Sequence, residues 1–213
     1  MPTGTSNCWP PPAECGPPTD SNPFASCYVR PGSLPYVFPS GITADVLVDR
    51  LRQHGWRGQI TGPHGSGKST LLQTLLPALE AAGRLVEYYP LHPGAATLGS
   101  LRRSSARWNG DTQVVIDGYE QLGWLRQQQV RWTCLARGAG LLVTAHRPLR
   151  LPVLWQTEVS LALTSQIVQR LLAGRSRSGV TEEAVAQAFA AQRGNLREVL
   201  FALYDRWEAD VHS

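Results

Sequence analysis

A glycine-rich segment at residues 62–69 carries the strongest chemical signal in this sequence. It reads Gly-Pro-His-Gly-Ser-Gly-Lys-Ser and fits the pattern G-x-x-x-x-G-K-[ST] at every specified position. The glycines allow the main chain to curl so that successive N–H groups point at phosphate oxygens, and Lys68 is expected to contact the terminal phosphates. The Ser69 hydroxyl is suited to help hold Mg²⁺. The segment therefore predicts a loop that binds a chain of phosphates.

The lysine content of the chain supports this interpretation. Lys68 is the only lysine, against nineteen arginines. A compact ammonium group thus occurs only where the pattern requires one, between phosphates. The residues predicted to contact the ligand are Gly62, Pro63, His64, Gly65, Ser66, Gly67, Lys68, Ser69 and Thr70.

Two carboxylates are candidates for holding a metal ion and for activating an attacking water. An apolar run at 114–116 ends at Asp117, as in a buried strand with an acid at its carboxyl end. We expect Asp117 to receive the Mg²⁺ that Ser69 holds, directly or through water. Glu120 is the nearest acid that could activate an attacking water, with Glu87 as a weaker substitute. A glutamate in the first helical turn also complements the helix dipole, so both interpretations of Glu120 stay open.

Polar residues at two further places are candidates for sensing the phosphates. Thr144, His146 and Arg147 follow the next apolar run, so they are expected at the ligand edge of the sheet. An ordinary strand-end turn closed by Pro148 explains the same residues equally well. Arg197 lies at the start of a predicted helix, where the helix dipole disfavours a cation, and this position is consistent with a contact to an anion.

An α/β scaffold with a parallel sheet is needed to position these residues. After residue 38 the sequence alternates short apolar runs with amphipathic stretches, which is typical of such a fold. Strands are predicted at 56–61, 85–89, 113–117, 140–144 and 159–163. A helix is predicted at 119–137 with Leu122, Leu125 and Leu135 facing inward. Only helical patterns follow residue 164.

The chain is accordingly divided into three parts. Residues 1–40 hold ten of the sixteen prolines and only three charged residues, which predicts a Pro-rich disordered tail without helix or paired strand. Residues 36–38 are expected to dock on the following domain. Residues 41–163 are predicted to form the nucleotide-binding α/β domain, and residues 164–213 a helical lid subdomain.

Composition and charge limit the classes of protein to which this chain could belong. The chain has 213 residues and a net charge of +4, which permits contact with a polyanion without indicating a dedicated nucleic-acid arm. No apolar run is long enough to span a membrane and no signal-peptide pattern is present, so a cytoplasmic location is expected. The four cysteines show no spacing typical of a zinc site or a disulfide framework.

Residues 40–210 resemble the AAA-plus branch of the P-loop ATPases in the order of their motifs along the chain. The resemblance rests on the 62–69 loop, on the strand-end Asp117, on a polar residue after the next strand, and on the run G-N-L-R-E at 194–198. It implies a parallel five-stranded sheet flanked by helices, a small helical lid, and ATP with Mg²⁺ as the ligand. By position it also implies a catalytic role for Lys68.

The same resemblance implies further roles, and the sequence departs from it at one position. Thr144 or His146 would be the first of the family's two sensor residues, which respond to the bound phosphates, and Arg197 would be the second. The family places its catalytic glutamate directly after the strand-end aspartate, whereas Gly118 occupies that position here and Glu120 comes later. Nucleotide binding is therefore a firmer expectation than hydrolysis. The family also uses an arginine finger that reaches a bound nucleotide. The candidates for it here are Arg126, Arg131 and Arg137.

The leading hypothesis is a Mg²⁺-dependent ATPase that couples ATP binding or hydrolysis to lid movement or self-assembly. One alternative is a P-loop kinase acting on a small molecule or a nucleic-acid end. Another is a nucleotide switch that binds without hydrolysing. Nucleic acid stays open as a partner in each case. No motif that reads guanine is evident, so adenine is the expected base.

Overall fold

Five short strands form one parallel sheet. They are β1 (Arg57–Thr61), β2 (Leu85–Pro90), β3 (Thr112–Asp117), β4 (Gly140–Ala145) and β5 (Val153–Gln156). Their order is β2-β3-β4-β1-β5, so β4 lies between the strand that precedes the glycine-rich loop and the strand that ends in Asp117. All four strand pairs are parallel. The predicted α/β class with a five-stranded parallel sheet is confirmed.

The computed structural model describes residues 21–91, 101, 103–173 and 180–211. Helices and 3₁₀ turns in these ranges are α1 (Ser26–Val29), α2 (Ala44–Gln53), α3 (Lys68–Ala81), η1 (Ser105–Arg107), η2 (Tyr119–Gln121), α5 (Trp124–Arg137), α6 (Leu161–Leu172), α7 (Glu182–Ala191) and α8 (Leu196–Val211). No helix in the described part of the chain is long and apolar enough to cross a membrane.

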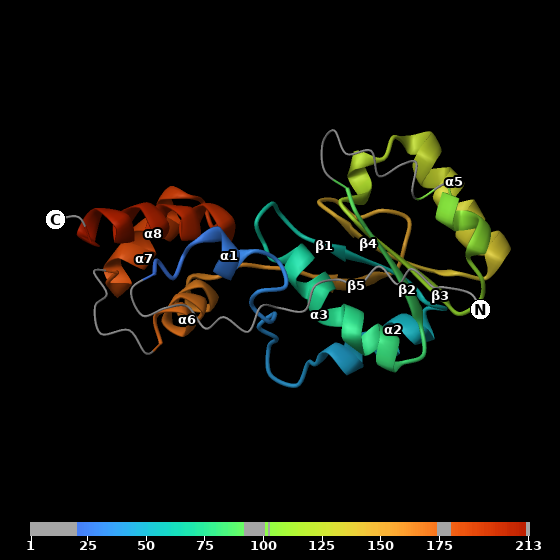
Figure 1. Cartoon of the computed structure of the whole chain (residues 1–213), viewed down its shortest axis with the longest axis horizontal. Coiled ribbons are helices and arrows are strands. Elements are labelled where there is room, and N and C mark those ends of the chain that lie inside the picture. Colours follow the sequence, from blue (N-terminus) through green and yellow to red (C-terminus); the bar gives the residue numbers. More distant parts are fainter. Residues whose placement is uncertain (1–20, 92–100, 102, 174–179, 212–213) are drawn as a thin grey trace, which may run out of the picture.

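Alternating side chains of the central strand β3 build a core on each face of the sheet. Val115 packs with α2 and α3 on one face, whereas Val114 and Ile116 pack with Val130 and Cys134 of α5 on the other. Figure 1 shows α2 and α3 on one side of the strands and α5 on the opposite side. Strands buried on both faces need nearly continuous apolar runs, which explains the sequence of β3. Its carboxyl end is thereby held at one edge of the sheet.

The predicted strand at 159–163 is wrong. The fifth strand is β5, which ends at Gln156, and residues 161–163 instead form the first turn of α6. The Ser160 side chain accepts a hydrogen bond from Leu163 N at 3.1 Å. A serine in this position satisfies a free N–H group of the first helical turn and so favours a helix over a strand.

The helix predicted at 119–137 is divided in two, and part of its predicted inner face is wrong. Residues 119–121 form the 3₁₀ turn η2, and α5 begins only after Gly123. Leu122 is buried in the intervening turn, but Leu125 and Leu135 are exposed, because the new start rotates Val130 and Cys134 toward the sheet.

Residues 21–38 form a segment that connects the C-terminal helices with the sheet; we call it the N-terminal strap. The prediction that residues 1–40 contain no helix is wrong, because α1 lies in this strap. Phe24 is fully buried, and its ring meets that of Trp207 edge-on at 6.4 Å. At the other end Trp155 Nε1 donates to Tyr36 Oη at 3.2 Å, and Tyr36 and Phe38 pack on the α2–α3 core. The predicted docking of 36–38 is thus confirmed for two of its residues.

The three predicted C-terminal helices are present as α6, α7 and α8. Their shared core includes Val168, Val185 and Val199, and Phe24 of the N-terminal strap closes it. In Figure 1 these helices form a lobe beside the sheet, with α1 against them. The boundaries predicted at residues 40 and 163 stay predictions.

Replacing Asn22 with alanine is expected to lower the free energy of unfolding by about 1–3 kcal/mol, because the buried Phe24 N, which donates to Asn22 Oδ1 at 3.0 Å, loses its hydrogen bond. Asn22 is buried, and its amide donates to Tyr204 O at 3.1 Å and to Glu208 Oε1 at 2.8 Å on α8. Urea unfolding measures the effect. Arg52→Ala, which removes an exposed ion pair with Asp49, serves as the control and should change stability by less than about 1 kcal/mol. An Asn22 variant as stable as this control would show that the hydrogen bonds of Asn22 add nothing to stability.

Candidate phosphate-binding site

The glycine-rich loop connects β1 to α3, so the predicted strand–loop–helix order is confirmed. Gly65 and Gly67 have φ angles of 68° and 85°, in the left-handed region that glycine adopts without strain. Gly67 directly precedes α3, whose first-turn N–H groups have no partner within the helix. A loop of this shape at a helix N-terminus is suited to an anion.

Thr157, which follows β5, holds the start of the loop. Thr157 N donates to Thr61 O at 2.7 Å, and its hydroxyl shares a hydrogen bond of 2.6 Å with Ser66 Oγ. Any Cβ at residue 62 would lie 2.6 Å from Thr157 O, so only glycine fits there. Sequence reasoning missed Thr157, because the fifth strand was predicted at the wrong place and this threonine was not expected beside the loop.

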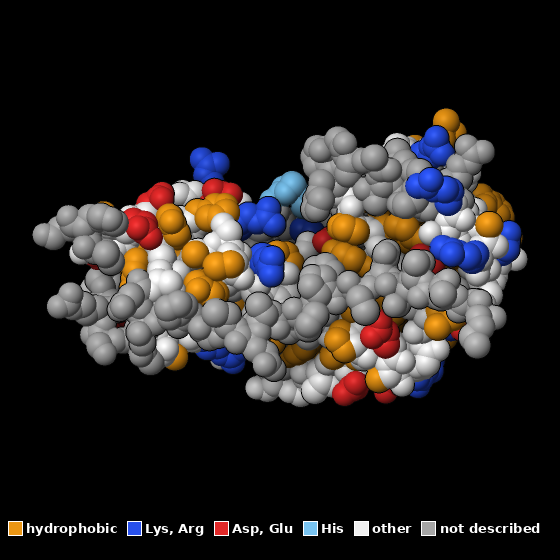
Figure 2. Space-filling view, in the orientation of Figure 1, with side chains coloured by type: hydrophobic (Ala, Val, Ile, Leu, Met, Phe, Trp, Pro, Cys, Tyr) orange, Lys and Arg blue, Asp and Glu red, His pale blue; other side chains and the backbone are white. Residues whose placement is uncertain are grey.

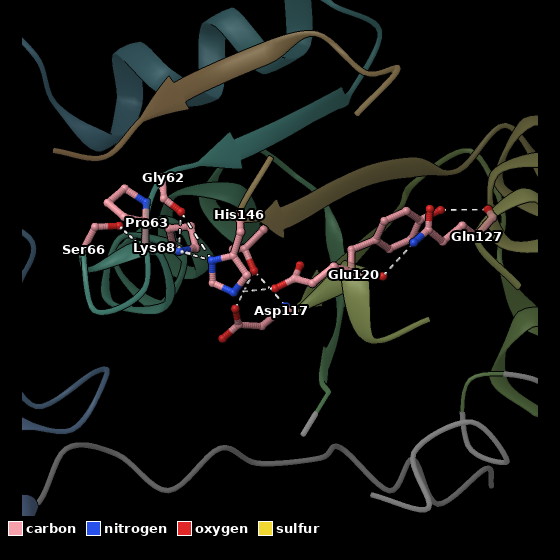
Figure 3. Close-up of polar contacts among 11 residues, drawn as sticks. Gly62, Pro63, Ser66, Lys68, Asp117, Glu120, Gln127 and His146 are labelled. Carbon is pink, nitrogen blue, oxygen red and sulfur yellow. Dashed lines mark hydrogen bonds and ion pairs between the residues drawn. The ribbon is translucent and has the colours of Figure 1, made fainter. Parts of the chain in front are cut away.

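Lys68 is held inside the loop by its main chain. Its Nζ donates to Gly62 O at 2.8 Å and to Pro63 O at 2.6 Å, and lies 3.2 Å from His146 Nδ1 (Figure 3). Burial lowers the pKa of Lys68, and the nearby Glu120 carboxylate opposes this shift. The single ammonium group of the chain is therefore fixed beside the loop carbonyls.

His146 connects Lys68 with Glu120. Its Nε2 lies 2.8 Å from Glu120 Oε1, and the His64 ring stacks on the His146 ring with centroids 3.5 Å apart. Burial, and next the Lys68 charge, lower the pKa of His146, which favours the neutral ring. The contacts assign the tautomer in which Nδ1 accepts from Lys68 and Nε2–H donates to Glu120. Figure 3 shows the imidazole between these two side chains.

Thr144 orients Asp117. Thr144 Oγ1 donates to Asp117 Oδ1 at 2.6 Å and accepts from Gly118 N at 2.7 Å. Tyr88 Oη lies 3.4 Å from the second carboxylate oxygen, Oδ2. Thr144 and His146 thus have separate partners, although the sequence suggested either for one role.

Glu120 supplies the second carboxylate of the site, because the backbone around residue 118 leaves no room for a side chain there. Gly118 has a φ of 83°, and a Cβ there would lie 2.9 Å from Leu91 O. The following 3₁₀ turn carries Glu120 toward the loop. Gln127 of α5 holds this turn, since its side chain donates to Leu122 O at 2.8 Å and to Tyr119 O at 3.3 Å.

One cavity brings most of the predicted residues together. It has a volume of about 540 Å³ and lies between the loop and the C-terminal helices. Its lining includes residues 64–70, Asp117, Glu120, Thr144, His146 and Arg197. Gly62 and Pro63 do not line the cavity and instead contact Lys68 through their carbonyls.

The start of α8 touches the loop directly. A Cβ on Gly65 would collide with the side chain of Asn195 and lie 3.3 Å from Arg197 N. The Arg197 charge is close enough to lower the pKa of Lys68. Figure 2 shows basic and histidine side chains gathered at the hollow between the two lobes. The loop and α8 therefore present positive charge to the same cavity.

The N-terminal strap also lines this cavity, through Ser26, Val29, Arg30 and Pro31. No signal in the sequence indicated this, because the strap was predicted as part of a disordered tail. Two residues considered from the sequence do not line it. Arg147 is exposed elsewhere, and the Glu87 carboxylate accepts a hydrogen bond from Tyr89 Oη at 2.7 Å.

Comparisons with known proteins give no close relative. No protein-family model matches the sequence, and no curated protein matches it. AMPPCP-bound DnaA from Aquifex aeolicus is similar at a TM-score of 0.48 and 16% identity, over 77% of this chain and 61% of that chain. C. elegans PCH-2 is similar at a TM-score of 0.33 and 11% identity, over 78% of this chain and 67% of that chain. The chain thus spans less than two thirds of the DnaA chain. With both TM-scores under 0.5, neither likeness bears on function.

Proposed function

We propose that this protein binds ATP with Mg²⁺ in the cavity between the glycine-rich loop and α8, and hydrolyses it. The observation that carries the proposal is the meeting of Lys68, Asp117 and Glu120 at one cavity beside the curled loop. Loop N–H groups and an ammonium group suit a triphosphate, while two carboxylates on the opposite side suit a metal and a water. No other lysine in the chain could take the place of Lys68.

Ser69 and Asp117 are the residues that would hold Mg²⁺. A hydroxyl and a carboxylate are the oxygen donors this ion prefers, and both residues line the cavity. The hydrogen bond from Thr144 occupies Oδ1 of Asp117, so the carboxylate is held in one orientation. When bound, the ion would neutralise charge on the phosphates.

Glu120 is placed to act on water. His146 holds Oε1, whereas Oε2 is buried and has no hydrogen-bond partner among the described residues. A buried carboxylate oxygen without a partner can accept a proton or a hydrogen bond from a bound water. Lys68 and Arg197 would stabilise the negative charge that develops on the terminal phosphate.

A switch that binds without hydrolysing is the second candidate, and Gly118 favours it. The acid that would follow Asp117 directly is absent there, so activation of water depends on Glu120 alone. Phosphate release with no added acceptor separates the candidates. Release supports the ATPase, and binding without turnover supports the switch. Formation of ADP only when an acceptor is present, with the phosphoryl group transferred to that acceptor, supports a kinase.

The first experiment measures binding of a fluorescent ATP analogue with and without Mg²⁺, with unlabelled ATP and GTP as competitors. Displacement by ATP at lower concentration than GTP would support adenine recognition. Mass determination under native conditions, with and without ATP and Mg²⁺, tests the predicted self-association. Failure to bind either nucleotide would reject the proposal.

Asp117→Asn is expected to raise the Mg²⁺ concentration needed for half-maximal phosphate release by roughly 10- to 100-fold, by analogy with the cost of disturbing metal-site residues. Nucleotide binding without Mg²⁺ should be retained, since Lys68 and the loop are unchanged. Asp111→Asn, an exposed residue just before the opposite end of β3, is the matched control. Equal Mg²⁺ dependence in both variants would remove Asp117 from the metal site.

A further inference from the structure

The outer face of α5 carries large apolar side chains that no described residue covers. The exposed fractions are 69% for Trp124, 73% for Leu125, 68% for Trp132 and 49% for Leu135. We call these four residues the α5 outer face. Apolar side chains gathered on one exposed surface indicate an interaction site. Two of the four are indoles, which offer broad flat rings as well as apolar area.

The chain segment that carries the α5 outer face contains arginines but no acidic residue. Residues 121–157 contain five arginines and no aspartate or glutamate. Three of these arginines, Arg126, Arg131 and Arg137, belong to α5, and none of them forms an ion pair with a described residue. Figure 2 shows basic and apolar side chains side by side over the α5 end of the molecule. This face therefore suits an anionic partner.

A second cavity adjoins this face and is separate from the phosphate-binding site. Its volume is about 660 Å³, and its lining includes Trp124, Arg131, Leu149, Arg150 and Leu151. Arg131 Nη2 donates to Arg150 O at 3.0 Å, which joins α5 to the connection between β4 and β5. The two cavities share no lining residue. A ligand here would thus not compete with a nucleotide at the loop.

We propose that the α5 outer face and its cavity bind single-stranded nucleic acid. Unpaired bases stack on exposed aromatic rings in a way that tolerates any sequence, and guanidinium groups bind the phosphates. A duplex keeps its base faces stacked inside and cannot use the indoles in this way. A second copy of the chain would bring the arginines of two α5 helices together, which disfavours a symmetric dimer here. An acidic peptide would satisfy the arginines, but only its aromatic residues could match the two indoles, whereas every nucleotide carries a flat base.

The test titrates the full chain into a fluorescein-labelled oligo(dT) of about 20 nucleotides and follows anisotropy, without ATP, so that the result is independent of the proposed ATPase. We expect tighter binding of this strand than of a duplex of equal length. Trp132→Ala and Trp124→Ala should each weaken binding about fivefold or more, as measured for base stacking on aromatic side chains. Trp132→Phe should retain most of the affinity, because a phenyl ring still stacks. These residues are exposed, so thermal unfolding should be unchanged.

Salt dependence supplies the second readout. Arg126→Gln should reduce the slope of log affinity against log salt by about 0.7, which corresponds to one lost phosphate contact on a single strand. Arg50→Gln removes an exposed arginine from α2, on the opposite face of the sheet, and is the control that should leave the slope unchanged.

Three outcomes would overturn the proposal. The first is no binding at low salt. The second is equal binding of single strand and duplex with no effect of the Trp variants, which indicates nonspecific attraction of a polyanion. The third is a dimer that Trp132→Ala dissociates, because a second copy would then cover the face.

Discussion

Lys68→Ala is expected to lower the affinity for ATP with Mg²⁺ by about 2–5 kcal/mol, or roughly 30- to 4000-fold. The reason is that Lys68 is the only lysine of the chain and lines the cavity from within the loop. Its removal would leave the phosphate charge opposite main-chain N–H groups, Arg30 and Arg197. Isothermal titration of ATP into both proteins measures the change.

Chemical labelling provides an independent check on the Lys68 assignment. With one lysine in the chain, an amine-reactive reagent modifies only Lys68 and the N-terminal amine. The lowered pKa of Lys68 increases its unprotonated, reactive fraction. ATP with Mg²⁺ should protect Lys68 and leave the N-terminal amine reactive. Equal ATP affinity of wild type and Lys68→Ala, or labelling that ATP does not slow, would reject the site.

Glu120→Gln is expected to lower the rate of phosphate release about 10²- to 10⁴-fold while leaving ATP affinity nearly unchanged. Glutamine keeps the size of the side chain and a partner for His146, but it cannot take a proton from water. Single-turnover phosphate release compared with equilibrium ATP binding separates the two effects.

Glu87→Gln is the matched control for this experiment. Glu87 lies on the edge strand β2, interacts with Tyr89, and does not line the cavity. Its substitution should leave turnover within about twofold, since distant surface changes rarely exceed about 0.5 kcal/mol. Should Glu120→Gln match the Glu87 variant, the carboxylate would serve only the electrostatics of its 3₁₀ turn.

The sheet and the phosphate-binding loop could be predicted because local patterns encode them. Residues 62–69 are contiguous, and their glycines and lysine act through the curl of one short stretch of backbone. The apolar run before Asp117 marks a strand buried on both faces, and the carboxyl ends of parallel strands meet at one edge. Asp117 and Thr144 were therefore expected near each other, and a 2.6 Å hydrogen bond joins them.

Errors arose where a single residue redirected the chain. Ser160 caps α6 and so converts an apolar stretch expected as a strand into a helix. Gly123 ends one turn and begins α5 afresh, which rotates Leu125 and Leu135 outward. Apolar periodicity alone did not reveal these starts, since it describes the inside of a helix better than its ends.

The sequence by itself determined that a glycine-rich loop joins a strand to a helix. It also predicted which residues of that loop would contact a triphosphate. Only the tertiary structure decided that His146 lies between Lys68 and Glu120. It also decided that Thr157 forms a hydrogen bond with the loop and that the N-terminal strap lines the cavity. These contacts join residues far apart in the chain. They depend on β4 lying between β3 and β1 and on the packing of Phe24 against α8, and no local pattern specifies either arrangement.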